Sequence, residues 1–236
     1  MATLYMVATP IGNLQDITLR ALEILKSVDV IACEDTRHTQ RLLNNFEIKK
    51  RLIATHSYNE VASAKGIVEL MDQGNNIAFC SDAGTPGISD PGARLANIVR
   101  KAGFDVVPLP GANAATTLVS AAGYVGKTFT FEGFLSPKSG RRKKRLEVLL
   151  ERDEAFIIYE SPFRVLKTMK ELAILAPDRI VVVGRELTKQ YEEIIRGTST
   201  EIVESLESRQ SIKGEFAICI CPIAAGIDKD DEDSNK

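Results

Sequence analysis

The chain has 236 residues, which is long for one domain and fits two domains of roughly 110 residues. Its residues are 44% hydrophobic and 26% charged, a composition ordinary for a globular protein. Its formal net charge of −2 argues against a strongly basic nucleic-acid-binding protein. No apolar run approaches the ~18–20 residues of a membrane span, and the first residues lack the basic and apolar regions of a signal peptide.

The charge is concentrated at one end. Residues 228–236 hold five acids and two lysines, so the other 227 residues carry 28 basic and 27 acidic side chains. This composition predicts a disordered tail at 228–236. The body is close to neutral, and any RNA-binding surface on it must be a local patch.

The cysteines indicate a cytosolic protein without a metal site. All four lie in apolar runs, none forms a Cys-x-x-Cys pair, and two histidines are too few to complete a zinc site with them. We therefore expect reduced thiols in the core, no bound metal and a cytoplasmic location.

Apolar runs typical of strands alternate with helical patterns five times in the first ~110 residues. The expected strands are 4–8, 28–33, 52–55, 77–80 and 105–109. Thr18 is expected to cap a helix whose apolar face holds Leu19, Leu22 and Leu25. This alternation predicts a mostly parallel sheet covered by helices, with its loops gathered at one edge.

The loop at 81–92 is the strongest candidate for a binding loop. It follows the apolar run 77–80 and contains three glycines and two prolines, which permit and then fix unusual backbone angles. Asp90 is expected to cap the next helix, with Pro91 in its first turn. In α/β proteins, ligands bind at the carboxyl ends of strands, although a well-made turn would have a similar sequence.

Two charged segments also follow expected strands. Residues 34–38, Glu-Asp-Thr-Arg-His, hold four ionisable side chains, which fit either a wall of a site or a cluster of caps and ion pairs. Residues 141–145 are five consecutive cations. They fit either the solvated start of a helix or a mobile basic lid that contacts phosphates.

The second half predicts a mixed sheet, because some of its strands follow one another without a helix between them. The expected strands are 129–135, 155–159, 180–183, 192–196 and 214–221. Residues 123–128 resemble the end of a P-loop, but Ala121 stands where the first glycine belongs and Lys127-Thr128 leads into a strand. We reject a P-loop here.

Taken together, the loop motifs resemble one family of methyltransferases. They occur in family order over residues 4–221, at 9–18, 32–37, 81–92, 110–111, 131–135, 159–164, 184–189 and 213–216. They are similar to the tetrapyrrole methylase-like superfamily, the class III methyltransferases that use S-adenosylmethionine. Within it the resemblance is to the enzymes that 2′-O-methylate a cytidine in the decoding centre of 16S rRNA. One departure is Ala8, where members commonly have glycine.

The resemblance implies two α/β domains of the tetrapyrrole methylase type, at 1–112 and 113–227, with a ligand cleft between them, and a homodimer. The first would have a mostly parallel sheet and the second a mixed sheet. The residues that the resemblance assigns to the methyl donor are Pro10, Ile11, Asp82, Ala83, Thr85, Asn113, Ala114, Tyr159, Gly214 and Phe216.

The expected reaction is an in-line displacement that depends mainly on alignment. Glu34, Asp35 and Glu186 are candidate general bases, and Lys189 would qualify only with a lowered pKa. The cations expected to bind RNA phosphates are Arg37, Lys138, Arg141, Arg142 and Arg185. The alternatives are methylation of a tetrapyrrole and a non-catalytic RNA-binding module.

Overall fold

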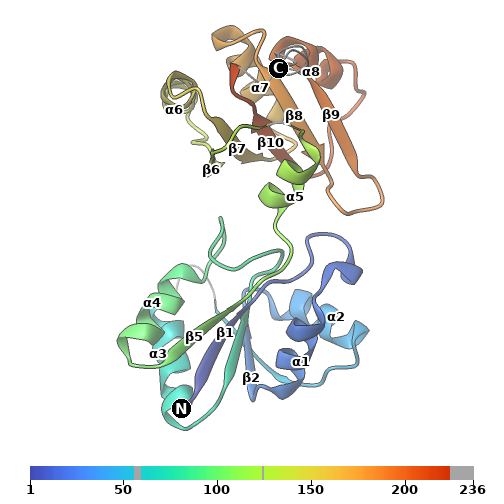
Figure 1. Ribbon diagram of the computed structural model, residues 1–236. Helices are drawn as coiled ribbons and strands as arrows, with labels where there is room; N and C mark the ends of the chain where they lie inside the picture. The colour runs from blue at the N-terminus through green and yellow to red at the C-terminus, as the bar shows by residue number, and fades with distance from the viewer. Residues whose placement is uncertain (56–59, 124, 224–236) are drawn as a thin grey trace, which may run out of the picture. The chain divides into compact units, whose positions relative to one another are not determined.

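The computed structural model describes residues 1–55, 60–123 and 125–223, so the tail predicted to be disordered lies outside the described residues. The chain divides into two units after Asn113 (Figure 1). The sequence places this boundary after residue 112.

The first unit is a parallel sheet between two layers of helices (Figure 1). Its strands run in the order β3-β2-β4-β1-β5, and every pair is parallel, as the alternating pattern predicts. The strands are β1 (Thr3–Val7), β2 (Val30–Cys33), β3 (Arg51–Ala54), β4 (Ile77–Cys80) and β5 (Asp105–Leu109). The helices are η1 (Leu14–Asp16, a 3₁₀ turn), α1 (Leu19–Ser27), α2 (Thr36–Asn45), α3 (Glu60–Asp72) and α4 (Ala93–Lys101).

Alternate strand residues build a core on each face of this sheet. In β4, Phe79 packs with α3 and α4, whereas Ala78 and Cys80 pack with α1 and α2. Because both faces are covered, β2 and β4 are buried along their whole length. Only the ends of the strands can therefore present polar groups to a ligand.

Two details of the helix starts and faces differ from the sequence prediction. Thr18 does cap α1, accepting a hydrogen bond from Ala21 N, but Leu19 is 79% exposed and the buried face holds Ala21 and Leu25. The prediction that Asp90 caps α4 is wrong. The N-cap is Gly92, whose φ of 130° is open to glycine but strained for other residues.

The second unit has a five-stranded mixed sheet, which confirms the prediction for this half. Its order is β6-β7-β10-β8-β9; only β6 and β7 are parallel. The strands are β6 (Phe129–Phe134), β7 (Ala155–Glu160), β8 (Ile180–Arg185), β9 (Glu193–Thr198) and β10 (Phe216–Ile220). The helices are α5 (Ala114–Ala121), α6 (Ser139–Glu151), α7 (Val165–Leu175) and α8 (Ser199–Glu207).

The core of this unit lies between the sheet and the three helices α6, α7 and α8. On α7, for example, Met169 and Leu172 are buried against Phe156 and Ile158 of β7. The remaining helix, α5, packs against β8 and β10, where Leu118 lies over Gly184. No helix within the described residues is long and apolar enough to cross a membrane.

Candidate functional site

Three loops at the carboxyl edge of the first sheet are joined by hydrogen bonds. Thr9 and Gly84 exchange two backbone hydrogen bonds of 2.9 and 3.0 Å, which link the loop after β1 to the loop after β4. Thr85 Oγ1 donates to the carbonyl of Ala112 at 3.0 Å, which adds the loop after β5. The glycine-rich segments of the sequence thus form one connected edge.

Close approaches between these loops explain two of their glycines. Gly84 has a φ of 82°, and a Cβ there would lie 3.2 Å from Ile11 Cγ2. A Cβ on Gly111 would lie 2.6 Å from the Cβ of Ala8. At this contact the chain accommodates alanine at position 8 because position 111 has no side chain.

The loop after β2 is joined to the same edge through a carboxylate. Asp82 Oδ1 accepts a hydrogen bond from Asp35 N at 3.0 Å. Asp35 itself caps α2 and binds Arg37, with 2.7 Å between Asp35 Oδ2 and Arg37 Nη2. Of the two interpretations of residues 34–38, the cluster of caps and ion pairs is the one that fits Asp35 and Arg37.

These contacts decide which of the two acids could accept a proton. The side-chain and backbone hydrogen bonds from Arg37 hold the pKa of Asp35 well below its usual range, so Asp35 is a weak base. Glu34 differs, because partial burial raises its pKa and the charges of Asp82 and Asp90 raise it further. A carboxylate with a raised pKa is the stronger proton acceptor.

The donor-binding residues predicted in the first unit line this edge. Ala83 is exposed, and the others are partly exposed, namely Pro10, Ile11, Asp82, Thr85 and Asn113. In the described part of the chain, the backbone amides of Ile11 and Ala83 have no hydrogen-bond acceptor. An edge with available amides and an adjacent carboxylate fits the amino-acid end of S-adenosylmethionine.

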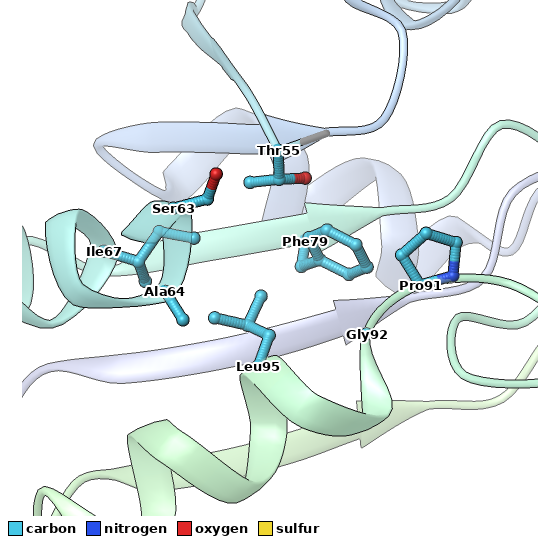
Figure 2. A pocket seen from close by; sticks show the side chains of 8 residues that line it. All are labelled: Thr55, Ser63, Ala64, Ile67, Phe79, Pro91, Gly92 and Leu95. Atoms are coloured by element: carbon cyan, nitrogen blue, oxygen red, sulfur yellow. The ribbon is translucent and has the colours of Figure 1, made fainter. Parts of the chain in front are cut away.

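A cavity lies beneath the loop after β4, between the sheet and helices α3 and α4 (Figure 2). Its volume is about 10 Å³, and Phe79, Gly92 and Leu95 are among its lining residues. This is about the space of one water molecule. The cavity is therefore a packing gap under the loop and is too small for a methyl donor.

In the second unit, Tyr159 lies at the end of β7 between two phenylalanines. Its ring contacts Phe131 and Phe134 edge to face, with centroid distances of 5.0 and 5.7 Å. Its hydroxyl oxygen accepts a hydrogen bond from Ala115 N at 3.0 Å. Tyr159 thus anchors the start of α5, of which the predicted donor-binding residue Ala114 is the first residue.

Gly214 and Phe216 lie at the start of β10, but they differ in what they offer a ligand. Phe216 is 3% exposed and belongs to the core of the unit. Its buried ring therefore offers no apolar surface to a ligand. Gly214 has a φ of 97°, and a Cβ there would lie 2.5 Å from Cγ of Glu186.

Glu186 and Lys189 form a compact ionic cluster with Glu215. Lys189 Nζ lies 2.9 Å from Glu186 Oε1 and 2.7 Å from Glu215 Oε2. Glu186 Oε1 also accepts a hydrogen bond from Glu215 N at 2.9 Å. The turn that carries the cluster is strained, since Glu186 and Thr188 have φ values of 50° and 65°.

The cluster argues against two of the predicted bases. Partial burial alone would lower the pKa of Lys189, but the hydrogen bonds to Glu186 and Glu215 outweigh it and raise the pKa above its usual value. The condition for a basic role of Lys189 is not met. The pKa of Glu186 is lowered, mainly by the hydrogen bond that its carboxylate accepts from Lys189. Glu186 is therefore a weaker base than Glu34.

The predicted phosphate-binding cations also divide into two groups. Lys138 and Arg141 are exposed, and Arg37 has 86% of its side chain exposed. Arg185 is mostly buried, and its Nε donates to Lys213 O at 2.6 Å.

Arg142 does not belong among the RNA contacts. Its side chain is 1% exposed, and its guanidinium forms two hydrogen bonds of 2.6 and 2.7 Å to the carboxylate of Glu171 on α7. The prediction that Arg142 binds RNA is therefore wrong. The run 141–145 lies within α6, as the helical interpretation predicts.

Glu171 and Glu215 are the residues of these networks that sequence reasoning missed. Neither acid is recognisable from the sequence alone, because Arg142 lies 29 residues from Glu171 along the chain and Lys189 lies 26 residues from Glu215. Glu215 is brought to Lys189 by the antiparallel pairing of β10 with β8, in which Phe216 faces Arg185. The residues described include no group of three metal-ligating side chains.

The fold and the loop motifs agree with comparisons to known proteins. The family model of the Tetrapyrrole (Corrin/Porphyrin) Methylases matches residues 3–203, and the chain belongs to this family. The crystal structure of the methyltransferase CobJ has the same fold, with a TM-score of 0.72, 18% identity and 95% of each chain covered.

Two similar proteins are both named Ribosomal RNA small subunit methyltransferase I. The protein from Bacillus subtilis is 47% identical over 220 residues, covering 93% of this chain and 75% of the relative. The protein from Haemophilus influenzae is 50% identical over 219 residues, covering 92% of this chain and 77% of the relative. The chain is thus similar to these relatives over both of its units.

Proposed function

We propose that this protein uses S-adenosylmethionine to methylate the 2′-oxygen of a cytidine in the decoding centre of 16S ribosomal RNA. The observation that carries the proposal is the 47–50% identity to relatives named for small-subunit rRNA methylation, over more than 90% of the chain. The similarity to CobJ, at 18% identity, supports the fold alone and does not favour a tetrapyrrole substrate.

The joined loops of the first unit fit the methyl donor. S-adenosylmethionine supplies a methyl group already activated on a sulfonium centre. We propose that the amides of Ile11 and Ala83 and the carboxylate of Asp82 bind its amino-acid end. Thr85 positions this edge through its hydrogen bond to Ala112.

We propose Glu34 as the proton acceptor for the ribose hydroxyl. Its pKa is raised by burial, whereas the pKa values of Asp35 and Glu186 are lowered by their cationic partners. A positioned base typically contributes about 10²–10⁴-fold to such a reaction. Alignment of the ribose in a site that excludes water contributes the rest.

Two measurements test the proposal. Calorimetry should detect binding of S-adenosylmethionine by the wild-type protein, and Asp82→Ala should weaken it. Small ribosomal subunits from cells lacking the gene should then gain one 2′-O-methyl group at a decoding-centre cytidine when incubated with protein and donor. A protein that binds RNA but no donor is a non-catalytic module, and methylation elsewhere on the RNA contradicts the assigned target.

The partner and the location belong to the same proposal. Because the target is ribosomal RNA, we propose that the protein acts in the cytoplasm on naked 16S rRNA or on the small subunit. Comparing methyl transfer to the two substrates decides which is used. We also propose the homodimer implied by the resemblance, which sedimentation of the purified protein tests.

A further inference from the structure

Two aromatic rings are uncovered at one edge of the second unit. Phe134, at the end of β6, is 58% exposed, and Phe163, in the turn between β7 and α7, is 95% exposed. Isolated apolar side chains are common on protein surfaces and need no explanation. These two need one because of what surrounds them.

The two rings belong to segments that are hydrogen-bonded to each other. Strands β6 and β7 are parallel, and Phe134 pairs with Tyr159 near the ends of both. Arg164, the neighbour of Phe163, donates from Nη2 to the carbonyl of Leu135 at 2.7 Å. The turn that carries Phe163 is therefore fixed against the segment that follows Phe134.

This edge also carries a net positive charge, because its acids are already neutralised by arginines and further cations remain. Arginine ion pairs occupy the carboxylates of Glu132, Glu160 and Glu171. Within the described ranges, four exposed cations at the N-cap and in the first turns of α6 have no ion pair. They are Lys138, Arg141, Lys143 and Lys144.

The orientation of α6 brings some of these cations toward β6. Arg145 of α6 binds Glu132 of β6 through two hydrogen bonds of 2.6 and 2.7 Å. Residues three and four apart lie on one side of a helix. Arg141, four residues before Arg145, therefore lies on the side of α6 that faces β6, and Lys138 is the N-cap residue at the start of the same helix.

We propose that Phe134 and Phe163 form a platform on which unpaired bases of the RNA substrate stack, with Lys138 and Arg141 binding the adjacent phosphates. Aromatic rings beside free cations are the combination with which proteins bind single-stranded nucleic acid. A second copy of the chain is a poorer occupant, since two copies of this positively charged edge would repel each other. The nature of the RNA rests on the proposed function, whereas the platform concerns where that RNA binds.

The chain has no tryptophan, so Phe163→Trp introduces a single fluorescent indole at the platform. The probe is a 12-nucleotide single-stranded RNA with a central cytidine, compared with a duplex of the same sequence. The single strand should quench the indole and the duplex should not, because duplex bases are stacked on one another. Ile174→Trp, at an exposed position of α7 (76%), is the matched control and should not respond.

Affinity gives a second readout that does not depend on fluorescence. Phe163→Ala should weaken binding of the single strand about 5- to 100-fold, and Ile174→Ala should leave it unchanged. The double variant Lys138→Ala/Arg141→Ala should lower the slope of log K against log salt concentration by about 0.7 for each cation.

Three outcomes of the RNA-binding measurements would overturn the platform. These are an indole at 163 that saturating RNA does not quench, Phe163→Ala with wild-type RNA affinity, and Phe163→Ala that changes the oligomeric state while RNA affinity is retained. The last outcome would identify a protein contact. Methyl transfer measured in parallel separates the two proposals: wild-type protein that binds RNA through Phe163 but transfers no methyl group contradicts only the function. Equal kcat/KM of wild type and Phe163→Ala on small subunits contradicts only the platform.

Discussion

Gly214 and Glu186 are packed so closely that a Cβ on Gly214 would lie 2.5 Å from the Cγ of Glu186 and 2.8 Å from its Cδ. The contact holds the Glu186 carboxylate beside Lys189 and the amide of Glu215. Two residues of separate motifs in the sequence are thus parts of one structure.

Replacing this glycine should disrupt the cluster. Gly214→Ala would displace Glu186 and place alanine at a φ of 97°, so we expect the free energy of unfolding to fall by about 1–3 kcal/mol. Urea unfolding measures the change. Gly66→Ala is the matched control, because Gly66 lies in α3 with nothing within 4 Å of a new Cβ. It should stabilise the protein by about 0.5–1 kcal/mol, and equal effects of the two substitutions would contradict this account.

The pH dependence of methyl transfer should report Glu34. A base acts when deprotonated, so kcat should rise with pH through a pKa above 4.5, the ordinary value for glutamate. Glu34→Gln should lower kcat by about 10²–10⁴-fold and leave donor affinity unchanged.

Asp90→Asn tests the electrostatic cause of the raised pKa. The negative charge of Asp90 raises the pKa of Glu34, so its removal should move the acidic limb of the profile to lower pH. A limb that stays in place would show that Asp90 contributes nothing to the raised pKa of Glu34, and Glu34→Gln with wild-type turnover would exclude Glu34 as the base.

The neighbours Arg141 and Arg142 should respond in opposite ways to substitution. Arg142→Ala leaves Glu171 without its partner and should cost about 3–5 kcal/mol of stability. Arg141→Ala removes an exposed side chain and should change stability by less than about 0.5 kcal/mol, while RNA binding weakens. Urea unfolding and RNA titration of both variants test the contrast, which fails if Arg142→Ala is as stable as Arg141→Ala.

The same ion pair should be visible in acid. The hydrogen bond from Arg142 lowers the pKa of Glu171 in the folded protein. The pair therefore stabilises the fold above about pH 4.5, the ordinary pKa, and this stability is lost as the pH falls below it. Glu171→Gln should flatten the loss of stability on acidification, and an unchanged pH profile would show that the pair makes no such contribution.

Tyr159→Phe should test the anchor of α5. The substitution keeps the ring beside Phe131 and Phe134 but removes the hydroxyl that accepts the hydrogen bond from the Ala115 amide. Loss of this hydrogen bond should cost about 0.5–1.5 kcal/mol in thermal or urea unfolding. Tyr191→Phe, at an exposed position (68%), should have no effect, and similar results for the two variants would remove the anchoring role.

Periodicity and strand-end loops were sufficient to predict the two sheets, because buried strands and amphipathic helices depend on local pattern. Local signals predicted the cap at Thr18 but not the one at Gly92. The backbone there has a φ of 130°, which a glycine permits but does not by itself predict. Leu19 was assigned to a buried face because the pattern does not show which side of the first turn the sheet covers.

The candidate site was less predictable, since its chemistry depends on partners distant in the chain. Arg142 looks like its neighbours in a run of five cations until Glu171 of α7 is placed beside it. Phe216 lies in a motif of the site, yet its ring points into the core. Asp35 and Glu34 are adjacent in sequence, yet Arg37 binds Asp35, whereas Glu34 is partly buried near the charges of Asp82 and Asp90.

The buried pair of Arg142 and Glu171 has a consequence for the rate of RNA association and for its entropic cost. It fastens α6 to α7, and two further bonds from Arg142 hold the carbonyls of Ser136 and Pro137. The positive charges are thereby displayed on a preorganised support, so little conformational entropy would be lost on association. The encounter rate would then follow ionic strength closely, as in electrostatically guided binding.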